Sequence, residues 1–436
     1  MSHAFAILVV GAGPAGIAAA VTAAECGARV GVVDDNPSPG GQIWRSGAHL
    51  PPAARRWKAR FEAAGVTRLQ GWRIVDCPKP GAVRAQRNGA DISGDSAAED
   101  GAELRYGQLI LATGARERFL PFPGWTLPNV MGAGGLDAMV RGGLPIAGKR
   151  VVVAGTGPLL LAVAAHLAER GATIVAICEQ ASSTQMAPLM LQILRQPGKV
   201  WQGASYRWAT RKSRYLTRCW PVAALGDQRL RSVILQRDGK QWCVECDYLA
   251  CGFHLAPNTE LAALLGCTLD NGFVATDELM QTSVPGVWCA GEPTGIGGVD
   301  LSLLEGQIAG LAAAGKTDDA RSLAEGRRGA LGFVRALERA CRLDAHLREL
   351  ARDETLVCRC EDVPLSALRG HAGWRDAKLH TRCGMGPCQG RICGGATDFL
   401  FGWRADSVRP PIFPALVSSF LAPDGTLDST TRKEAV

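Results

Sequence analysis

Two glycine-rich turns, each between an apolar run and a helical pattern, constrain the fold of this chain most strongly. The first turn, Gly11-Ala12-Gly13-Pro14-Ala15-Gly16, follows directly on the apolar run 4–10. Residues 17–26 carry an Ala-rich helix pattern, and a second apolar run at 29–33 ends at Asp34-Asp35. Apolar runs of this kind are typical of buried parallel strands. The order strand, turn, helix and strand therefore predicts a βαβ unit.

A second βαβ pattern begins at Arg150. Its turn is Gly155-Thr156-Gly157-Pro158-Leu159-Leu160, with strands expected at 151–154 and 173–178 and a helix at 159–170. Two such units predict an α/β fold with two Rossmann-like dinucleotide-binding domains, one inserted in the other. We expect the following divisions: 1–125 and 270–317 for the first domain, 126–269 for the second, 318–353 for a helical connector, 354–412 for a small C-terminal cysteine-rich module and 413–436 for a polar tail. The polar segment 84–103 is expected to form a surface hairpin or loop.

The residues of the first turn suit a bound dinucleotide. Gly11 permits the tight turn, Gly13 lets the backbone approach a pyrophosphate, and Gly16 lets helix and strand pack closely. The helix N-terminus offers amide donors to the anion. Asp34 lies at the end of the second strand, where an acid accepts hydrogen bonds from a ribose.

Three further segments favour FAD over NAD. Gly40-Gly41-Gln42 follows the second strand, the apolar run 109–112 ends in Ala-Thr-Gly, and the run 287–290 ends in a Gly-Glu pair before a helix start near Val299. The FAD-binding residues predicted in this way are Gly11, Gly13, Pro14, Ala15, Gly16, Asp34, Asp35, Gly41, Gln42, Thr113, Gly114, Gly291, Glu292 and Val299.

On these residues the chain resembles the two-domain flavoproteins related to glutathione and thioredoxin reductases. In that group the second glycine turn binds NAD(P)H. Here Leu160 replaces its third glycine, although Glu179 keeps the acid at the end of the next strand. No cysteine follows Gly41, and the pair Cys243 and Cys246 lies beyond the position of a redox dithiol. We therefore expect an idle second nucleotide site and no disulfide reduction.

Five of the fifteen cysteines fall between 358 and 393, in two short segments. Cys358 and Cys360 form a Cys-x-Cys motif, and Cys383, Cys388 and Cys393 lie in a Gly-rich segment. A [2Fe–2S] cluster needs four ligands, usually thiolates. One loop can place two sulfurs on one iron, and the second loop can supply the other two. A zinc site built from the same thiolates is the alternative.

Together, these cysteine motifs and the degenerate second glycine turn resemble a narrower family: the larger subunits of opine oxidases, D-hydroxyproline dehydrogenases and bacterial hydrogen cyanide synthase, with a C-terminal module like bacterioferritin-associated ferredoxin. The resemblance implies the metal ligands Cys358, Cys360, Cys388 and Cys393, and leaves Cys383 spare. It implies a partner flavoprotein subunit of the D-amino-acid oxidase type that oxidises the amine, so we expect no catalytic residue in this chain. Some relatives also bind FMN at the subunit junction or contain a small third subunit.

Charge and hydropathy exclude several other classes of protein. The net charge is +7, and the densest basic cluster, residues 207–218, is interpreted as a solvated face or a docking surface. The chain has neither the aromatic readers nor a module of nucleic-acid-binding proteins. No apolar stretch reaches the roughly 18 residues of a membrane span, and the apolar start is interpreted as a strand rather than a signal peptide. We expect a cytoplasmic protein, with peripheral membrane association through its electron acceptor left open.

Three alternatives to an amine dehydrogenase subunit remain at this stage. They are a stand-alone NAD(P)H-dependent reductase of the ferredoxin type, a hydrogen cyanide synthase component that uses glycine, and a zinc-stabilised assembly protein without enzymatic activity.

Overall fold

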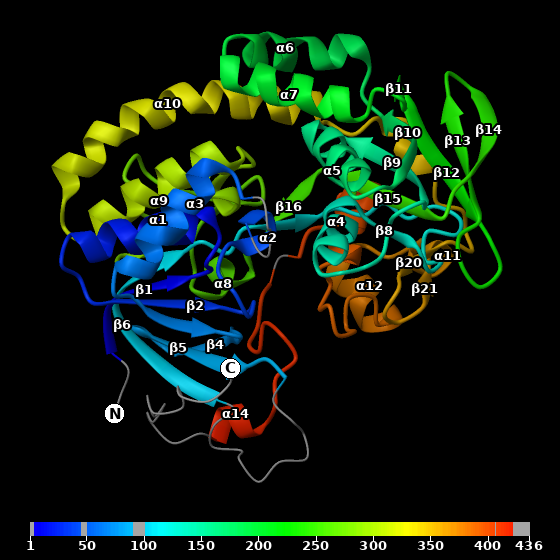
Figure 1. Ribbon diagram of the computed structural model, residues 1–436. Coiled ribbons are helices and arrows are strands. Elements are labelled where there is room, and N and C mark those ends of the chain that lie inside the picture. Colours follow the sequence, from blue (N-terminus) through cyan, green and yellow to red (C-terminus); the bar gives the residue numbers. More distant parts are fainter. Residues whose placement is uncertain (1–3, 45–49, 90–100, 406, 422–436) are drawn as a thin grey trace. The chain divides into compact units, whose positions relative to one another are not determined.

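The structure is a computed structural model (Figure 1), which describes residues 4–44, 50–89, 101–405 and 407–421. The chain divides into two compact units. Unit 1 comprises Met1–Ala115, Pro257–Leu331 and Ser407–Val436, and unit 2 comprises Arg116–Ala256 and Gly332–Asp406. The loop expected within 84–103 falls mainly on 90–100, and most of the expected tail falls on 422–436. Both of these segments lie outside the described residues.

Unit 1 is built on a seven-stranded sheet with the order β3-β2-β1-β6-β5-β4, in which β19 also pairs with β6. Strands β1, β2, β3, β6 and β19 are parallel where they pair, whereas β4 and β5 form an antiparallel extension along the first half of β6. The strands are β1 (Ala4–Val10), β2 (Val30–Asp34), β3 (Thr67–Gln70), β4 (Trp72–Lys79), β5 (Ala82–Arg87), β6 (Gly101–Leu111) and β19 (Val287–Cys289). Because these strands are parallel, the carboxyl ends of β1, β2, β6 and β19 lie at the same edge of the sheet.

Two helices of small residues pack against each other in unit 1: α1 (Pro14–Glu25) and α9 (Val299–Ala313). A Cβ atom on Gly306 would overlap the carbonyl oxygen of Ala15, so this close approach requires glycine. The remaining elements of the unit are α2 (Gly41–Trp44), α3 (Pro52–Ala63), α8 (Glu260–Leu264), η1 (Glu292–Thr294), α14 (Ser418–Leu421) and the hairpin of β17 (Leu269–Asp270) and β18 (Phe273–Val274).

Unit 2 contains a five-stranded parallel sheet with the order β11-β10-β9-β15-β8 and a separate antiparallel sheet of β12, β13 and β14. The strands are β8 (Val130–Gly132), β9 (Arg150–Thr156), β10 (Thr173–Glu179), β11 (Arg214–Thr217), β12 (Cys219–Leu225), β13 (Ser232–Arg237), β14 (Lys240–Glu245) and β15 (Tyr248–Phe253). Its helices are α4 (Ala133–Arg141), α5 (Pro158–Glu169), α6 (Ser183–Leu194) and α7 (Pro197–Ala209). The chain passes between the units at β7 (Ala115–Glu117), at β16 (Leu255–Pro257), within α10 (Thr317–Ala340) and between Asp406 and Ser407.

The cysteine-rich segment of unit 2 has a small core of its own. Val357, Val363, Leu365 and Leu368 are buried together with Cys358, Cys383 and Cys393. The elements of this segment are η2 (Ala345–Glu349), β20 (Leu356–Cys358), β21 (Val363–Pro364), α11 (Leu365–Leu368), α12 (Trp374–Thr381) and α13 (Cys393–Phe401).

The α/β class and the two Rossmann-like βαβ units predicted from the sequence are confirmed by this architecture. Both glycine-rich turns lie between a parallel strand and the N-terminus of a helix. None of the helices in the described part of the chain is long and apolar enough to cross a membrane.

Candidate cofactor sites

The first glycine turn, between β1 and α1, tolerates no side chain at two of its positions. Gly11 has a φ of 104°, and a Cβ atom there would overlap the carbonyl oxygen of Ala112, directly after β6. A Cβ atom on Gly16 would overlap the carbonyl oxygen of Gly11. Strand, turn and helix therefore meet at a distance that only glycine allows, as the turn motif predicted for Gly16.

The two acids at the end of β2 have different surroundings. Asp34 is buried, and its carboxylate accepts hydrogen bonds from the Ala12 amide and from the Asn36 amide (2.7 Å) and side chain (2.8 Å). Burial raises the pKa of Asp34, and these hydrogen bonds oppose the rise. A carboxylate has about four lone-pair positions, so about one remains for a ribose hydroxyl. Asp35 is more exposed and pairs with Arg73 at 3.3 Å.

The second pair of glycines lies directly against the first turn. The Gly40 amide donates to the carbonyl oxygen of Ala12 (2.8 Å). Gly41 has a φ of 57°, and a Cβ atom on it would lie 2.9 Å from the Cα atom of Gly13. Gln42 follows on the short helix α2. The chain thus leaves a backbone-lined surface on Gly13 and Gly41, at which a phosphate can approach closely.

The Ala-Thr-Gly segment after β6 is fixed by the chain that returns at residue 258. The Thr113 hydroxyl donates to the Asn258 carbonyl oxygen (2.6 Å), and the Asn258 side chain donates to the Thr113 carbonyl oxygen (2.9 Å). The Asn258 amide also donates to the carbonyl oxygen of Gly114 (3.0 Å). Sequence reasoning did not foresee Asn258 in this position.

Glu305 organises the turn after β19 and was not among the predicted site residues. It is fully buried, and its carboxylate accepts hydrogen bonds from the Gly291 amide (2.9 Å) and the Thr294 hydroxyl (2.7 Å). Its other oxygen pairs with the Arg327 guanidinium at 2.8 Å. The available signal was an acid in the otherwise apolar middle of the helix that begins at Val299.

Glu292 carries an unsatisfied acceptor. One carboxylate oxygen accepts a hydrogen bond from the Gly298 amide (3.0 Å), whereas Oε2 is buried and has no partner among the described residues. Burial, reinforced by the charge of Glu305, raises the pKa of Glu292 to about 7. Buried polar atoms are normally paired, so Oε2 fits a ligand that brings a hydroxyl donor, as the ribityl chain of FAD does.

At the second glycine turn, the acid Glu179 binds backbone amides of the protein itself. Glu179 is fully buried and accepts hydrogen bonds from the amides of Gly157 (2.7 Å) and Ala181 (2.9 Å). Leu160, which replaces the third glycine of the motif, is fully buried in the core between sheet and helix, close to Gly252.

The residues that follow α10 lie over this second turn. The Cys341 sulfur is 2.7 Å from the position that a Cβ atom on Gly157 would take. The side-chain amides of Gln180 and Gln185 both donate to the Arg342 carbonyl oxygen, at 3.2 and 2.8 Å. A dinucleotide phosphate that approached Gly157 would have to displace this segment.

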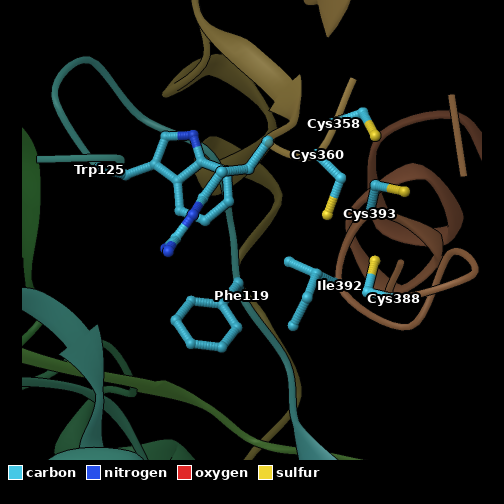
Figure 2. A pocket seen from close by; sticks show the side chains of 8 residues that line it. Phe119, Trp125, Cys358, Cys360, Cys388, Ile392 and Cys393 are labelled. Atoms are coloured by element: carbon cyan, nitrogen blue, oxygen red, sulfur yellow. The ribbon is translucent and has the colours of Figure 1, made fainter. Parts of the chain in front are cut away.

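The four predicted thiolate ligands line one cavity of about 220 Å³ in unit 2 (Figure 2). Trp125 on its wall is held by a hydrogen bond from its indole to the Leu356 carbonyl oxygen (2.6 Å). A Cβ atom on Gly386 would overlap the Cβ atom of Cys360, so the two cysteine loops meet at a glycine. The lining residues are Phe119, Trp125, Cys358, Arg359, Cys360, Cys388, Ile392 and Cys393.

The sulfurs are grouped differently from the expected pairs. Those of Cys358, Cys383 and Cys393 lie within 4.8 Å of one another. This group joins the two loops, whereas the sequence motifs predicted that each loop serves one iron. Hydrogen bonds from the Cys383 and Cys393 thiols lower the pKa of Cys358 to about 2, and raise their own pKa values. Cys383, considered spare from the resemblance, is buried beside two predicted ligands.

Comparison with known proteins adds a family to this geometry. Residues 5–306 match the family described as pyridine nucleotide-disulphide oxidoreductase. The chain belongs to this family. It is therefore an oxidoreductase, and the match supports FAD as the cofactor of unit 1.

The relatives extend the likeness to the C-terminal segment. The chain is 32% identical to the A subunit of the opine oxidase of Rhizobium meliloti (strain 1021), over 93% of this chain and 96% of the relative. It is also 32% identical to the hydrogen cyanide synthase subunit HcnB of Pseudomonas aeruginosa, over 95% and 97%. The L-proline dehydrogenase of P. horikoshii has a similar fold, with a TM-score of 0.67 at 16% identity over 96% of this chain and 80% of that one.

Proposed function

We propose that this chain is the electron-transfer subunit of a heteromeric amine or imino-acid dehydrogenase, with FAD in unit 1 and a [2Fe–2S] cluster in the cysteine-rich segment of unit 2. The observation that carries the proposal is the cavity lined by Cys358, Cys360, Cys388 and Cys393 in a chain of this oxidoreductase family. When bound, the flavin would accept electrons in pairs or singly, and the cluster would accept them singly.

The residues of unit 1 supply the binding and the orientation for FAD. Gly13 and Gly41 would let the pyrophosphate approach the backbone closely at the N-terminus of α1, whose dipole favours an anion. The Gly11 amide instead donates to the Val33 carbonyl oxygen (2.7 Å) and holds the turn against β2. Asp34 would accept from the ribose, and Glu292 Oε2 from the ribityl chain. The other predicted residues lie at helix starts or just after strands. Those at the starts of α1, α2 and α9 are Pro14, Ala15, Gly16, Gln42 and Val299, and those that follow β2, β6 and β19 are Asp35, Thr113, Gly114 and Gly291.

The cysteine-rich segment supplies a set of donors that consists of sulfur alone. Thiolates are the usual ligands of iron–sulfur clusters, and the aromatic side chains of Phe119 and Trp125 line the same cavity. Zinc is the rival occupant, and the compact group of Cys358, Cys383 and Cys393 is the observation that favours it.

The relatives' names support the proposed substrate class. The named relatives are subunits of opine oxidase and hydrogen cyanide synthase, so we propose that a partner flavoprotein subunit of the D-amino-acid oxidase type oxidises the amine. Its substrate would be an opine, D-hydroxyproline or proline, or glycine if the complex is a cyanide synthase. An FMN at the subunit junction and a small third subunit belong to the same proposal.

The test is reconstitution with the partner subunit. Amine-dependent reduction of an artificial electron acceptor should require both chains, and adding NADPH to this chain alone should leave its flavin oxidised. Amine oxidation by this chain without a partner, or rapid bleaching of its flavin by NADPH, would contradict the proposal. Cyanide formed from glycine by the complex would select the synthase alternative.

A further inference from the structure

Helices α6 and α7 form a helical hairpin in unit 2 (Figure 1), called here the α6–α7 hairpin (183–209). This hairpin exposes apolar side chains. On α6, Ala187, Met190, Leu191 and Leu194 are all exposed. Their spacing of three and four residues places them on one face of the helix. Leu189, the one fully buried residue of α6, lies on the opposite face. Helix α6 is therefore apolar on both its inner and its outer face.

Helix α7 continues this apolar surface with two tryptophans. Trp201 is 79% exposed and Trp208 is 70% exposed, and their separation of seven positions, about two helical turns, places both on the same face. Val200 and Ala204 are exposed next to them, and no residue of α7 is fully buried. Large apolar side chains in a group of this kind mark a surface for interaction.

The charge of the surrounding segment has a single sign. Between Glu179 and Asp227 the sequence contains no acid and seven basic residues, Arg195, Lys199, Arg207, Arg211, Lys212, Arg214 and Arg218. The formal charge of the segment thus equals the +7 of the whole chain. Arg218 pairs with Asp238, but Arg195, Arg211 and Lys212 form no ion pair within the described residues. The Arg211 guanidinium lies 4.6 Å from the ring centre of Trp208, so charge and aromatic surface adjoin.

We infer that the α6–α7 hairpin is a docking surface for the anionic face of a phospholipid membrane. Exposed Trp, Leu and Met interleaved with Arg and Lys is the composition of helices that lie in the headgroup region, with apolar side chains inserted and bases at the phosphates. The inference goes beyond the proposed function, because it depends on neither the flavin nor the cluster.

Charge argues against a second copy of this chain as the occupant. Two identical hairpins in contact would bring together two acid-free segments of the same positive sign, and like charges facing each other across an interface are unfavourable. The exposed apolar side chains of the hairpin do not belong to the hydrophobic core either, because they lie on the surface of unit 2.

The test is co-sedimentation of the intact chain with vesicles of phosphatidylcholine, with and without phosphatidylglycerol. The variants are Trp201→Ser/Trp208→Ser, Arg211→Ser/Lys212→Ser, and the matched control Arg55→Ser/Arg56→Ser. The control removes two adjacent exposed bases from α3 of unit 1 and so changes the net charge equally. Size-exclusion elution and the visible spectrum of each variant report whether its fold is kept.

We expect binding only to vesicles that contain phosphatidylglycerol, weakened by salt. Since each basic residue near an anionic membrane contributes about 1 kcal/mol, the Arg211 and Lys212 pair should weaken binding roughly 30-fold. Loss of each tryptophan should weaken it about tenfold, and the control should bind like the unmodified chain. No binding to anionic vesicles, or equal weakening in the control and in the hairpin variants, would overturn the inference. So would loss of a dimer or of a partner subunit in the tryptophan variant, without any loss of vesicle binding.

Discussion

The substitution Glu292→Gln should stabilise the flavin-free protein at alkaline pH. Burial is the main reason that the pKa of Glu292 rises from its ordinary 4.5 to about 7. Because the folded state holds this proton more tightly than the unfolded state, the stability that it contributes is complete below about pH 4.5 and is lost as the pH rises through about 7. A glutamine keeps the acceptor for the Gly298 amide and has no charge to bury.

The magnitude follows from the displacement of the pKa. At ~1.4 kcal/mol for each pKa unit, it corresponds to about 3 kcal/mol in the fully ionised protein. The variant should therefore exceed the unmodified chain by up to about 3 kcal/mol in free energy of unfolding at pH 8 to 9, and should match it at about pH 4.

Urea denaturation of protein stripped of flavin, repeated across this pH range, measures the difference. Glu62→Gln on the exposed side of α3 is the control and should change the stability by less than about 0.5 kcal/mol at every pH. A Glu292→Gln variant that gained nothing at pH 8, or gained equally at pH 4, would refute the assignment of Glu292 as a buried carboxyl that ionises against a cost.

Three further predictions concern the FAD site, the cysteine-rich segment and the second glycine turn. Gly16→Ala forces a Cβ atom onto the carbonyl oxygen of Gly11, so the free energy of unfolding should fall by roughly 1–3 kcal/mol, and the purified protein should lose most of its FAD absorbance; unchanged FAD content would contradict the close-packed turn. Cys383→Ser should keep iron and sulfide near the unmodified content, whereas Cys388→Ser should lose both; the reverse result would exchange these two residues in the ligand set. Isothermal titration of the chain with NADH or NADPH should give no heat of binding, because the segment after α10 lies over Gly157; tight binding would show that this segment is readily displaced.

Local patterns predicted the regular elements of unit 1 well. The apolar run 4–10 is β1, and the run that ends at Asp34 is β2, because fully buried parallel strands need continuous apolar side chains. The first glycine turn could also be predicted from the sequence, because neighbouring backbone atoms leave no room for a Cβ atom at Gly11 or Gly16. The four cysteines predicted as metal ligands line one cavity. The sulfurs that lie within 4.8 Å of one another, however, come from both loops, which the spacing of the motifs did not predict.

Contacts between residues far apart in sequence could not be predicted from one chain. The hydrogen bonds between Thr113 and Asn258 join residues that have no shared local pattern. The ion pair of Glu305 and Arg327 links two helices, α9 and α10, whose register depends on tertiary packing. The placement of Cys341 against Gly157 likewise depends on where α10 ends. Such contacts leave no local pattern in the sequence, because they form only when distant segments pack together in the folded chain.

Iron and acid-labile sulfide in anaerobically purified chain test the central claim most directly. The account predicts about two irons and two sulfides per chain, together with one FAD, which is the content of one [2Fe–2S] cluster. Zinc without sulfide, in protein that keeps its flavin, would contradict the electron-transfer role proposed for the cysteine-rich segment.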